Sequence, residues 1–344
     1  MGFFSLTQDI AMDLGTANTV ITVNGKVMVD EPSVVALDCS DNKNKKMIAV
    51  GSRAKMMHEK THENITTCRP LRDGVIADFN ACEQMIRGLI KMVRTGRHLF
   101  PQSLRMVIGV PSGSTEVELR AVRDSAEHAG GRDVYLLFEP MAAAIGMGLN
   151  VEEPEGNMVV DIGGGSTEIA VISLGGIETN NSIRVAGDEL TADIQDYMSR
   201  QYNVKISERM AERIKINVGS ALVELPEDVA PQPYVVHGPN KVTSLPMEIP
   251  VSYPEVAHCI DRSLAQIEGA VLSALEHTKP ELYADIVRNG IWLTGGGALL
   301  RGLDKRLEDK IKIKFHVAED PLHSVAQGTA IALKNVHNFA FLMR

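Results

Sequence analysis

The chain has 344 residues, 44% hydrophobic and 23% charged, a composition typical of a globular protein with room for two domains. Its formal net charge of −9 argues against general nucleic-acid binding, which favours a basic surface. The cysteines Cys39, Cys68, Cys82 and Cys259 stand in no metal-binding spacing, and no apolar run approaches the ~20 residues that span a bilayer.

The first predicted element is a strand that ends in a glycine turn. Apolar residues 10–12 lead into Asp13, and an alternating strand follows the turn at Gly15. Further along, the polar run 41–46 is typical of a surface loop.

Residues 91–101 mix basic and apolar side chains. The basic residues are typical of a helix C-terminus that stops at Gly96. They are equally typical of a basic collar around an apolar tip, Leu99-Phe100, that suits an anionic membrane surface. The residues alone leave both interpretations open.

The next segments alternate between strand and helix, which predicts an α/β fold. The pattern predicts strands over 105–110 and 134–138, and helices over 115–129 and 140–148. Glu139 stands where the second strand ends and a helix opens at Pro140. A carboxylate there suits orienting a water for attack on a phosphate, but its position alone favours an acid that complements the helix dipole.

An internal repeat is the most informative feature of the sequence. Residues 161–171 align without gaps to residues 13–23, and both copies follow an apolar strand. The repeat predicts two related domains, each with a strand, a tight glycine turn and a second strand.

The chemistry of the paired turns suits a nucleoside triphosphate. Glycine permits close approach of backbone N–H donors to phosphate oxygens. Asp13 and Asp161 precede the turns, where carboxylates suit hydrated Mg²⁺. A pair of ordinary hairpins is the alternative, and two matched copies make it the weaker one. The turn side chains that suit hydrogen bonds to phosphate are Thr16, Asn18, Thr19, Ser166 and Thr167.

Three later segments complete the pattern. A helix over 207–218 brings Glu212, Arg213 and Lys215 together, as a solvated face or as a polar wall for a nucleoside. Residues 225–254 contain seven prolines and are expected to be irregular or β-rich, before a long amphipathic helix over 256–275. A strand over 286–294 leads into Gly295-Gly296-Gly297, which suits a nucleoside loop or an ordinary strand–helix turn.

These motifs together resemble the actin, Hsp70 and sugar-kinase ATPase superfamily, and within it the MreB family of bacterial actins. The two Asp-Gly turns resemble its phosphate motifs, 291–302 its adenosine motif, and 139–146 and 325–330 its connecting helices. The segments closest to the MreB family are 13–19, 69–79, 108–113, 150–167, 186–189 and 211–215.

The resemblance implies a nucleotide site for ATP with Mg²⁺. It assigns Thr16, Ala17 and Asn18 to one phosphate loop, and Gly163, Gly164 and Gly165 to the other. It assigns Glu212, Arg213, Ile214 and Lys215, with Gly295, Gly296, Gly297 and Ala298, to the nucleoside. Asp13 and Asp161 would hold Mg²⁺ through water, and Glu139 would orient the hydrolytic water. The family usually reads Glu-Glu-Pro where this chain has Phe138-Glu139-Pro140, and Glu139 keeps the position beside proline.

The resemblance also implies an actin-like fold of two RNase H-like domains with smaller inserted subdomains. Subdomain IA is expected over 1–32, 66–147 and 318–344, and subdomain IB over 33–65. Subdomain IIA is expected over 148–180 and 251–317, and subdomain IIB over 181–250.

The function that the resemblance implies is a cytoplasmic ATPase that polymerises into paired protofilaments on the inner face of the cytoplasmic membrane. Leu99 and Phe100 would insert into that membrane, and helix 115–129 would join the protofilaments. The expected partners are further copies of the chain, the membrane surface and membrane proteins of the cell-wall elongation machinery, through which the filaments would help determine cell shape. A small-molecule kinase on the same fold and a scaffold without hydrolysis are the alternatives.

Overall fold

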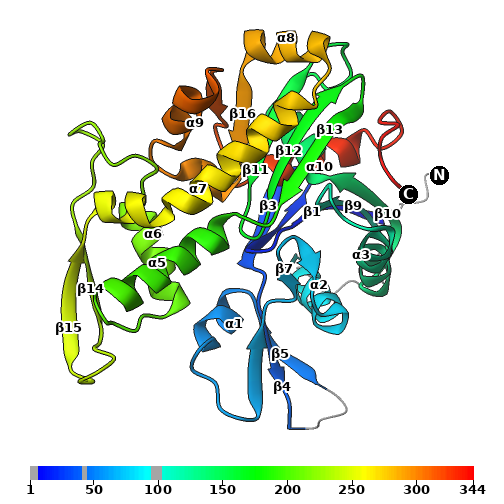
Figure 1. The fold of residues 1–344 in the computed structure, drawn as a ribbon. Coiled ribbons are helices and arrows are strands. Elements are labelled where there is room, and N and C mark those ends of the chain that lie inside the picture. The colour runs from blue at the N-terminus through cyan, green and yellow to red at the C-terminus, as the bar shows by residue number, and fades with distance from the viewer. Residues whose placement is uncertain (1–6, 41–44, 94–102) are drawn as a thin grey trace.

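The structure is a computed structural model that describes residues 7–40, 45–93 and 103–344. Two five-stranded sheets form its centre, and each contains one copy of the sequence repeat (Figure 1). In spatial order, the first sheet consists of β10 (Gly131–Phe138), β9 (Ser103–Val110), β1 (Thr7–Leu14), β2 (Asn18–Val23) and β3 (Lys26–Pro32). The second sheet consists of β13 (Gly176–Ile183), β12 (Thr167–Ser173), β11 (Asn157–Ile162), β16 (Ile291–Thr294) and β17 (Phe315–Val317).

The two sheets have the same topology. In each, three antiparallel strands that are consecutive in the chain lie beside two parallel strands that come later. The hairpins β1–β2 and β11–β12 are the two copies of the sequence repeat, and they occupy equivalent places in their sheets. The duplication and the α/β fold class that the sequence predicts are therefore confirmed.

Two helices lie between the sheets, α4 (Glu139–Gly146) and α10 (Ser324–Lys334). Their apolar side chains share one buried cluster with both sheets. A Cβ atom on Gly146 would collide with the carbonyl of Ser324, and one on Gly328 with the carbonyl of Ala142. Glycine at these positions lets the two helix backbones touch, which joins the halves of the molecule.

We call β1–β10 with α1–α3 the first lobe and β11–β17 with α5–α9 the second lobe. The larger helices that cover the sheets are α2 (Phe79–Val93), α3 (Glu116–His128), α7 (Tyr253–Glu276), α8 (Pro280–Asn289) and α9 (Leu303–Ile311). Capping boxes begin two of them, with Thr115 and Glu118 at α3 and Ser252 and Glu255 at α7. The predicted helices over 115–129 and 256–275 are therefore confirmed within a few residues.

Each lobe also carries smaller elements away from its main sheet (Figure 1). In the first lobe these are β4 (Val35–Asp38), β5 (Lys46–Val50), α1 (Ser52–Met57), β6 (Ile65–Cys68), β7 (Leu71–Arg72) and β8 (Val75–Ile76). In the second lobe they are α5 (Gly187–Gln201), α6 (Glu208–Val218), β14 (Tyr234–Pro239) and β15 (Pro246–Val251). The hairpin β14–β15 confirms that the proline-rich region 225–254 is partly β.

One predicted strand, over 286–294, is wrong in its first half. Residues up to Asn289 belong to helix α8, and the strand begins only at Ile291. Ile286 is fully buried as part of the apolar stripe of that helix, and Gly290 ends the helix with a positive φ of 82°. Apolar residues 286–287 belong to the helix end and 291–293 to the strand, and short apolar stretches of this kind do not reveal by periodicity which of the two they form.

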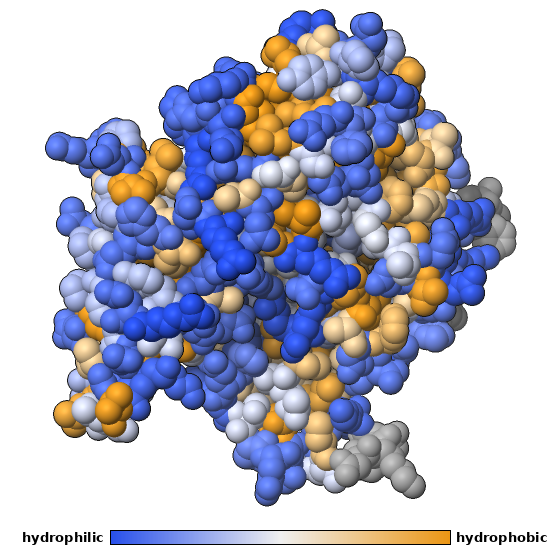
Figure 2. Space-filling view, viewed as in Figure 1, coloured by the Kyte–Doolittle hydropathy of each residue, from blue (hydrophilic) through white to orange (hydrophobic). Residues whose placement is uncertain are grey.

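Figure 2 shows hydrophilic side chains in the middle of the view, between α5 and β7, where the lobes face each other. Over the ranges that the structure describes, no helix has both the length and the apolar character needed to cross a membrane.

Candidate nucleotide site

The two glycine turns lie against each other where the lobes meet. Residues 15–17 join β1 to β2, and residues 163–166 join β11 to β12. A Cβ atom on Gly164 would lie 2.7 Å from the Cβ atom of Ala17, and one on Gly165 would lie 2.8 Å from Cγ2 of Thr16. These separations are too short for real side chains, so close contact between the turns requires glycine at both positions.

Four carboxyl groups lie close enough behind the turns to affect one another's ionisation: Asp13, Glu139, Asp161 and Glu168. Burial, followed by the charges of Asp13 and Glu168, raises the pKa of Asp161 to about 7. Burial, partly offset by the charge of His323, raises the pKa of Asp13 to about 7 as well. Burial and then the charges of Asp13, Glu168 and Asp161 raise the pKa of Glu139 well above its usual value.

This group of acids suits a cation with a shell of water. Carboxylates that repel one another are stabilised by a positive charge, and Mg²⁺ prefers oxygen ligands while keeping several of its waters. Among the described side chains, no three of the His, Cys, Asp and Glu type converge closely enough to bind a metal directly. Asp13 and Asp161 are oxygen donors of the kind that Mg²⁺ prefers.

Glu168 is a member of this group that the sequence interpretation missed. Its side chain is 1% exposed in β12, and it accepts hydrogen bonds from the hydroxyls of Ser112 and Ser182. Because Ser112 follows β9 of the first lobe, this contact crosses between the lobes. The available signal was an acid at the repeat position where the first copy has Val20.

His323 is a second residue that the sequence did not indicate. It precedes α10, and its Nδ1 atom lies 2.8 Å from Oδ2 of Asp320 while its Nε2 atom lies 3.5 Å from Oδ2 of Asp30. Burial lowers the pKa of His323, but these two carboxylates outweigh burial and raise it. Asn18, the first residue of β2 directly after the first turn, donates a 2.9 Å hydrogen bond to Asp30, so the histidine is linked to the end of that turn.

Lys215 is the centre of a polar cluster behind the second turn. Its ammonium donates to the Gly187 carbonyl at 2.7 Å and to the Thr191 hydroxyl at 2.9 Å, and it pairs with Glu212 at 2.7 Å. Burial raises the pKa of Glu212, but Lys215 and Thr191 lower it by more, which keeps the carboxylate ionised. The N–H of Gly187 donates to the carbonyl of Gly163, which ties α5 and α6 to the turn.

The other two predicted residues of α6 lie elsewhere. Ile214 is fully buried in the hydrophobic core of the second lobe. Arg213 lines a pocket of about 310 Å³ together with Arg209 and residues 58–60 of the first lobe. The side chain of Arg213 therefore faces the space between the lobes, and that of Ile214 does not.

The third glycine segment lies beside Asp161. Gly295 follows β16 with a positive φ of 78°, and a Cβ atom on it would collide with the carboxylate of Asp161. A Cβ atom on Gly297 would collide with the side chain of Ile162. Residues 295–298 therefore lie against the end of β11, next to the second turn. Leu99 and Phe100, the predicted membrane contacts, lie outside the described residues.

The duplicated sheets, with two helices between them and contacting turns at their meeting point, define the actin-like α/β fold. The model of the MreB/Mbl protein family matches residues 7–340, and the chain belongs to that family.

Individual relatives are similar to this chain over almost the whole length of both proteins. Cell shape-determining protein Mbl of Bacillus subtilis (strain 168) is 45% identical over 330 residues, which is 96% of each protein. Cell shape-determining protein MreB of Escherichia coli (strain K12) is 46% identical over 337 residues, 97% of this chain and 95% of that protein. The crystal structure of MreB 5 of Spiroplasma citri bound to AMPPNP has a TM-score of 0.88 and 36% identity, covering 96% of this chain and 97% of that one.

Proposed function

We propose that this chain is a Mg²⁺-dependent ATPase of the bacterial cytoskeleton, which takes part in determining cell shape. The observation that carries the proposal is the contact between two glycine turns from different lobes, with buried aspartates behind them. A nucleotide held by both turns selects the closed arrangement of the lobes, since it gains contacts that an open arrangement lacks. Relatives support the proposal: structures of MreB 5 of Spiroplasma citri are bound to AMPPNP and to ADP.

The turns would hold the phosphates. Backbone N–H groups of 16–18 and 163–165 would donate to phosphate oxygens, with the Thr16 hydroxyl as a further donor. Asp13 and Asp161 would hold Mg²⁺ through its waters. The bound metal would offset the charge of the phosphates, as in other phosphoryl-transfer enzymes.

Glu139 would orient the water that attacks the terminal phosphate. Besides burial, the charges of Asp13 and Asp161 keep its pKa high in the metal-free protein. Once both aspartates are neutralised by binding, Glu139 loses this repulsion and ionises more readily. An ionised carboxylate accepts a hydrogen bond from water, which is the form that a general base requires.

The nucleoside would lie between α6 and the third glycine segment. Glu212 and Lys215 already hold each other in the cluster at α5, and Arg213 faces the space between the lobes. Ile214 would contribute through backbone packing, because its side chain is buried. Residues 295–298 would contact the adenosine from the other side.

The domain organisation that we propose keeps the four expected subdomains. Subdomain IA comprises 1–32, 66–147 and 318–344, subdomain IB 33–65, subdomain IIA 148–180 and 251–317, and subdomain IIB 181–250. The five strands of each main sheet fall within IA or IIA, apart from the last residues of β13, and the hairpin β14–β15 falls almost entirely within IIB. This agreement supports the division.

We further propose that the ATP-bound chain polymerises into paired protofilaments on the inner face of the cytoplasmic membrane. Leu99 and Phe100 would contact the lipid, and membrane proteins of the cell-wall elongation machinery would be the partners. Relatives named as cell shape-determining proteins, at 45% and 46% identity, support this role.

Phosphate release tests the enzymatic proposal. We expect the purified chain to release phosphate from Mg-ATP, and the change Glu139→Gln to slow release by about 10²–10⁴-fold, as for loss of a general base. Binding of a fluorescent ATP analogue should persist, because Glu139 lies behind the turns rather than in them. The exposed acid Glu152 is a control, and Glu152→Gln should keep the wild-type rate. An undiminished rate in Glu139→Gln would remove the assigned role.

A further inference from the structure

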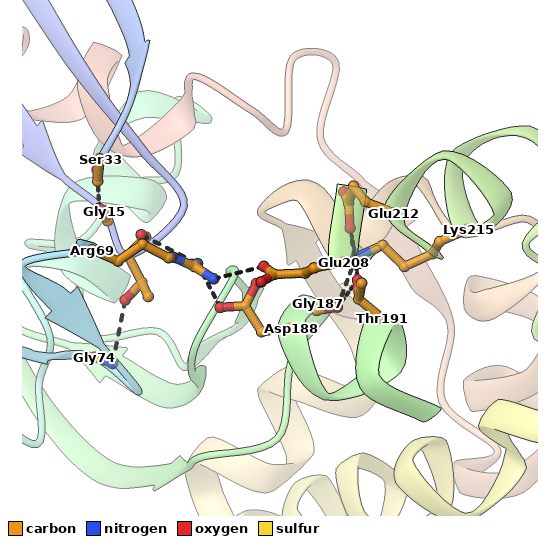
Figure 3. A network of polar contacts seen from close by, with 11 residues as sticks. Gly15, Ser33, Arg69, Gly74, Gly187, Asp188, Thr191, Glu208, Glu212 and Lys215 are labelled. Carbon is orange, nitrogen blue, oxygen red and sulfur yellow. Dashed lines mark hydrogen bonds and ion pairs between the residues drawn. The ribbon is translucent and has the colours of Figure 1, made fainter. Parts of the chain in front are cut away.

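Arg69 is a first-lobe side chain whose ionic partners are in the second lobe. It follows β6, and its guanidinium donates from Nη2 to Asp188 at 2.6 Å and from Nη1 to Glu208 at 3.2 Å (Figure 3). Asp188 lies in the first turn of α5, and Glu208 is the first residue of α6. Any separation of the lobes at this point has to break both ion pairs.

The same guanidinium is connected to both phosphate turns. Its Nη2 atom lies 3.5 Å from the carbonyl oxygen of Thr16 in the first turn. In the second turn, the carbonyl of Gly164 accepts a 2.7 Å hydrogen bond from the N–H of Asp188. One side chain therefore contacts the backbone of one turn and the residue that holds the other.

The charges around Arg69 are unbalanced without it. Burial raises the pKa of Asp188 most strongly, Arg69 and then Lys215 lower it, and the neighbouring Glu208 raises it again, so that it stays above its usual value. Removal of the guanidinium would leave two carboxylates facing each other beside a site for polyphosphate. Both the lost tie and the added negative charge would then favour an open arrangement and disfavour an anionic ligand.

The Arg69 guanidinium is more buried than that of an ordinary surface ion pair. The side chain of Arg69 is 21% exposed, against 62% for Arg288, which also pairs with two carboxylates. Exposed pairs contribute little because water screens them. The Arg69 guanidinium is less exposed than that of Arg288, and its partners Asp188 and Glu208 are 36% and 49% exposed, so screening weakens the Asp188 pair less than the Glu208 pair.

We propose that Arg69 is a positioning residue that clamps the two phosphate turns together across the lobes and so controls how long a bound nucleotide stays. This inference rests on the proposed ATP site. Since the clamp acts on lobe separation, its main effect is on the dissociation rate and the Michaelis constant. The chemical step depends on Glu139, and its rate at saturating ATP should change less.

The test is the dissociation rate of a fluorescent ATP analogue, chased with unlabelled Mg-ATP, from the full chain. We expect Arg69→Ala to raise the rate at least tenfold and Arg69→Lys to give an intermediate value, because an ammonium lacks the planar fork that reaches several partners. In the Arg69→Ala background, Asp188→Asn should bring no further increase, since the partner of Asp188 is already absent.

Arg288→Ala is the matched control, because Arg288 pairs with Glu155 and Asp285, both in the second lobe. It should leave the dissociation rate within twofold of wild type. If a thermal unfolding experiment shows that Arg69→Ala is not folded, the smaller changes Asp188→Asn and Glu208→Gln are tested in its place. Each should raise the dissociation rate of the ATP analogue about threefold.

The outcomes separate the two proposals. A wild-type chain that binds no nucleotide would remove the proposed function. A wild-type chain that binds, with dissociation from Arg69→Ala within twofold of wild type, would overturn the clamp alone. Additive effects of Arg69→Ala and Asp188→Asn would also overturn it, because independent residues do not form one tie.

Discussion

At the scale of single residues, close backbone approach decides which substitutions the two glycine turns tolerate. Gly164 is not among the residues with positive φ, and the nearest atoms that a Cβ there would meet are the Cβ of Ala17 at 2.7 Å and its backbone N at 3.2 Å. We expect Gly164→Ala to weaken nucleotide binding by about 1–3 kcal/mol, the usual cost of overpacking. Titration with a fluorescent ATP analogue measures this.

A second change in the opposite turn provides the control for that prediction. Ala17→Gly removes the nearest atom that the new methyl group would meet, so the double variant should recover part of the lost affinity. Gly269→Ala in α7 meets nothing within 4 Å and should leave binding unchanged. Equal affinities for Gly164→Ala and wild type would show that the turns do not meet as described.

The raised pKa of Asp161 makes the stability of the metal-free protein depend on pH. Burial, followed by the charges of Asp13 and Glu168, raises this pKa from 3.8 to about 7. Between these values the folded protein keeps a proton that the unfolded chain has released. The contribution is therefore fully present below pH ~4 and is lost as the pH rises through ~7.

Urea unfolding in EDTA, from pH 5 to pH 8, measures this contribution. Wild-type protein should lose stability with rising pH relative to Asp161→Asn, which has no such proton. Mg-ATP should reduce or reverse the slope, because it binds the ionised form. Parallel pH profiles for the two proteins would contradict the raised pKa.

At the scale of elements, α3 presents an apolar residue on a charged helix. Val117 is 73% exposed in the first turn, between the two residues of the capping box, Thr115 and Glu118. If α3 joins two protofilaments, Val117→Glu places a negative charge on the α3 helix of each protofilament at their contact. Like charges that face each other across an interface are destabilising. We expect ATP-dependent sedimentation with lipid vesicles to persist, while electron microscopy shows single instead of paired filaments.

Val242→Glu is the matched change for that experiment. Val242 is 81% exposed next to the hairpin β14–β15 in the second lobe, far along the chain from α3. It should leave the pairing of filaments unaltered. Paired filaments formed by Val117→Glu would exclude α3 as the junction.

At the scale of the whole molecule, the lobes are joined by polar contacts as well as by α4 and α10. Ser112 of the first lobe donates from its hydroxyl to Glu168 and accepts from Asn180 at its carbonyl, 3.2 Å away. Ser112→Ala leaves a carboxylate that is 1% exposed with one donor fewer. A buried acceptor that loses a partner costs about 1–3 kcal/mol, which urea unfolding should detect.

Ser114→Ala is the control, since the described residues include no hydrogen-bond partner for that hydroxyl. It should change the free energy of unfolding by less than about 0.5 kcal/mol, as is usual for such substitutions. An equally small effect of Ser112→Ala would show that this contact does not hold the lobes together.

Much of the architecture could be predicted from local patterns. The repeat at 13–23 and 161–171 predicts two related hairpins because each copy is a continuous run with its own glycine turn. The error at 286–289 arises because a helix end and a strand start lie on either side of Gly290, each with a short apolar stretch. Periodicity records burial, and burial alone does not distinguish these two conformations.

The sequence by itself determined the α/β class, the duplication, the glycine turns and the aspartates before them, because each is encoded by neighbouring residues. Only the tertiary structure decided that Glu168 joins the acids, that His323 is linked to Asn18, and that Arg69 pairs across the lobes. These partners lie up to hundreds of residues apart. Their meeting depends on how two sheets pack around α4 and α10, which no local pattern specifies.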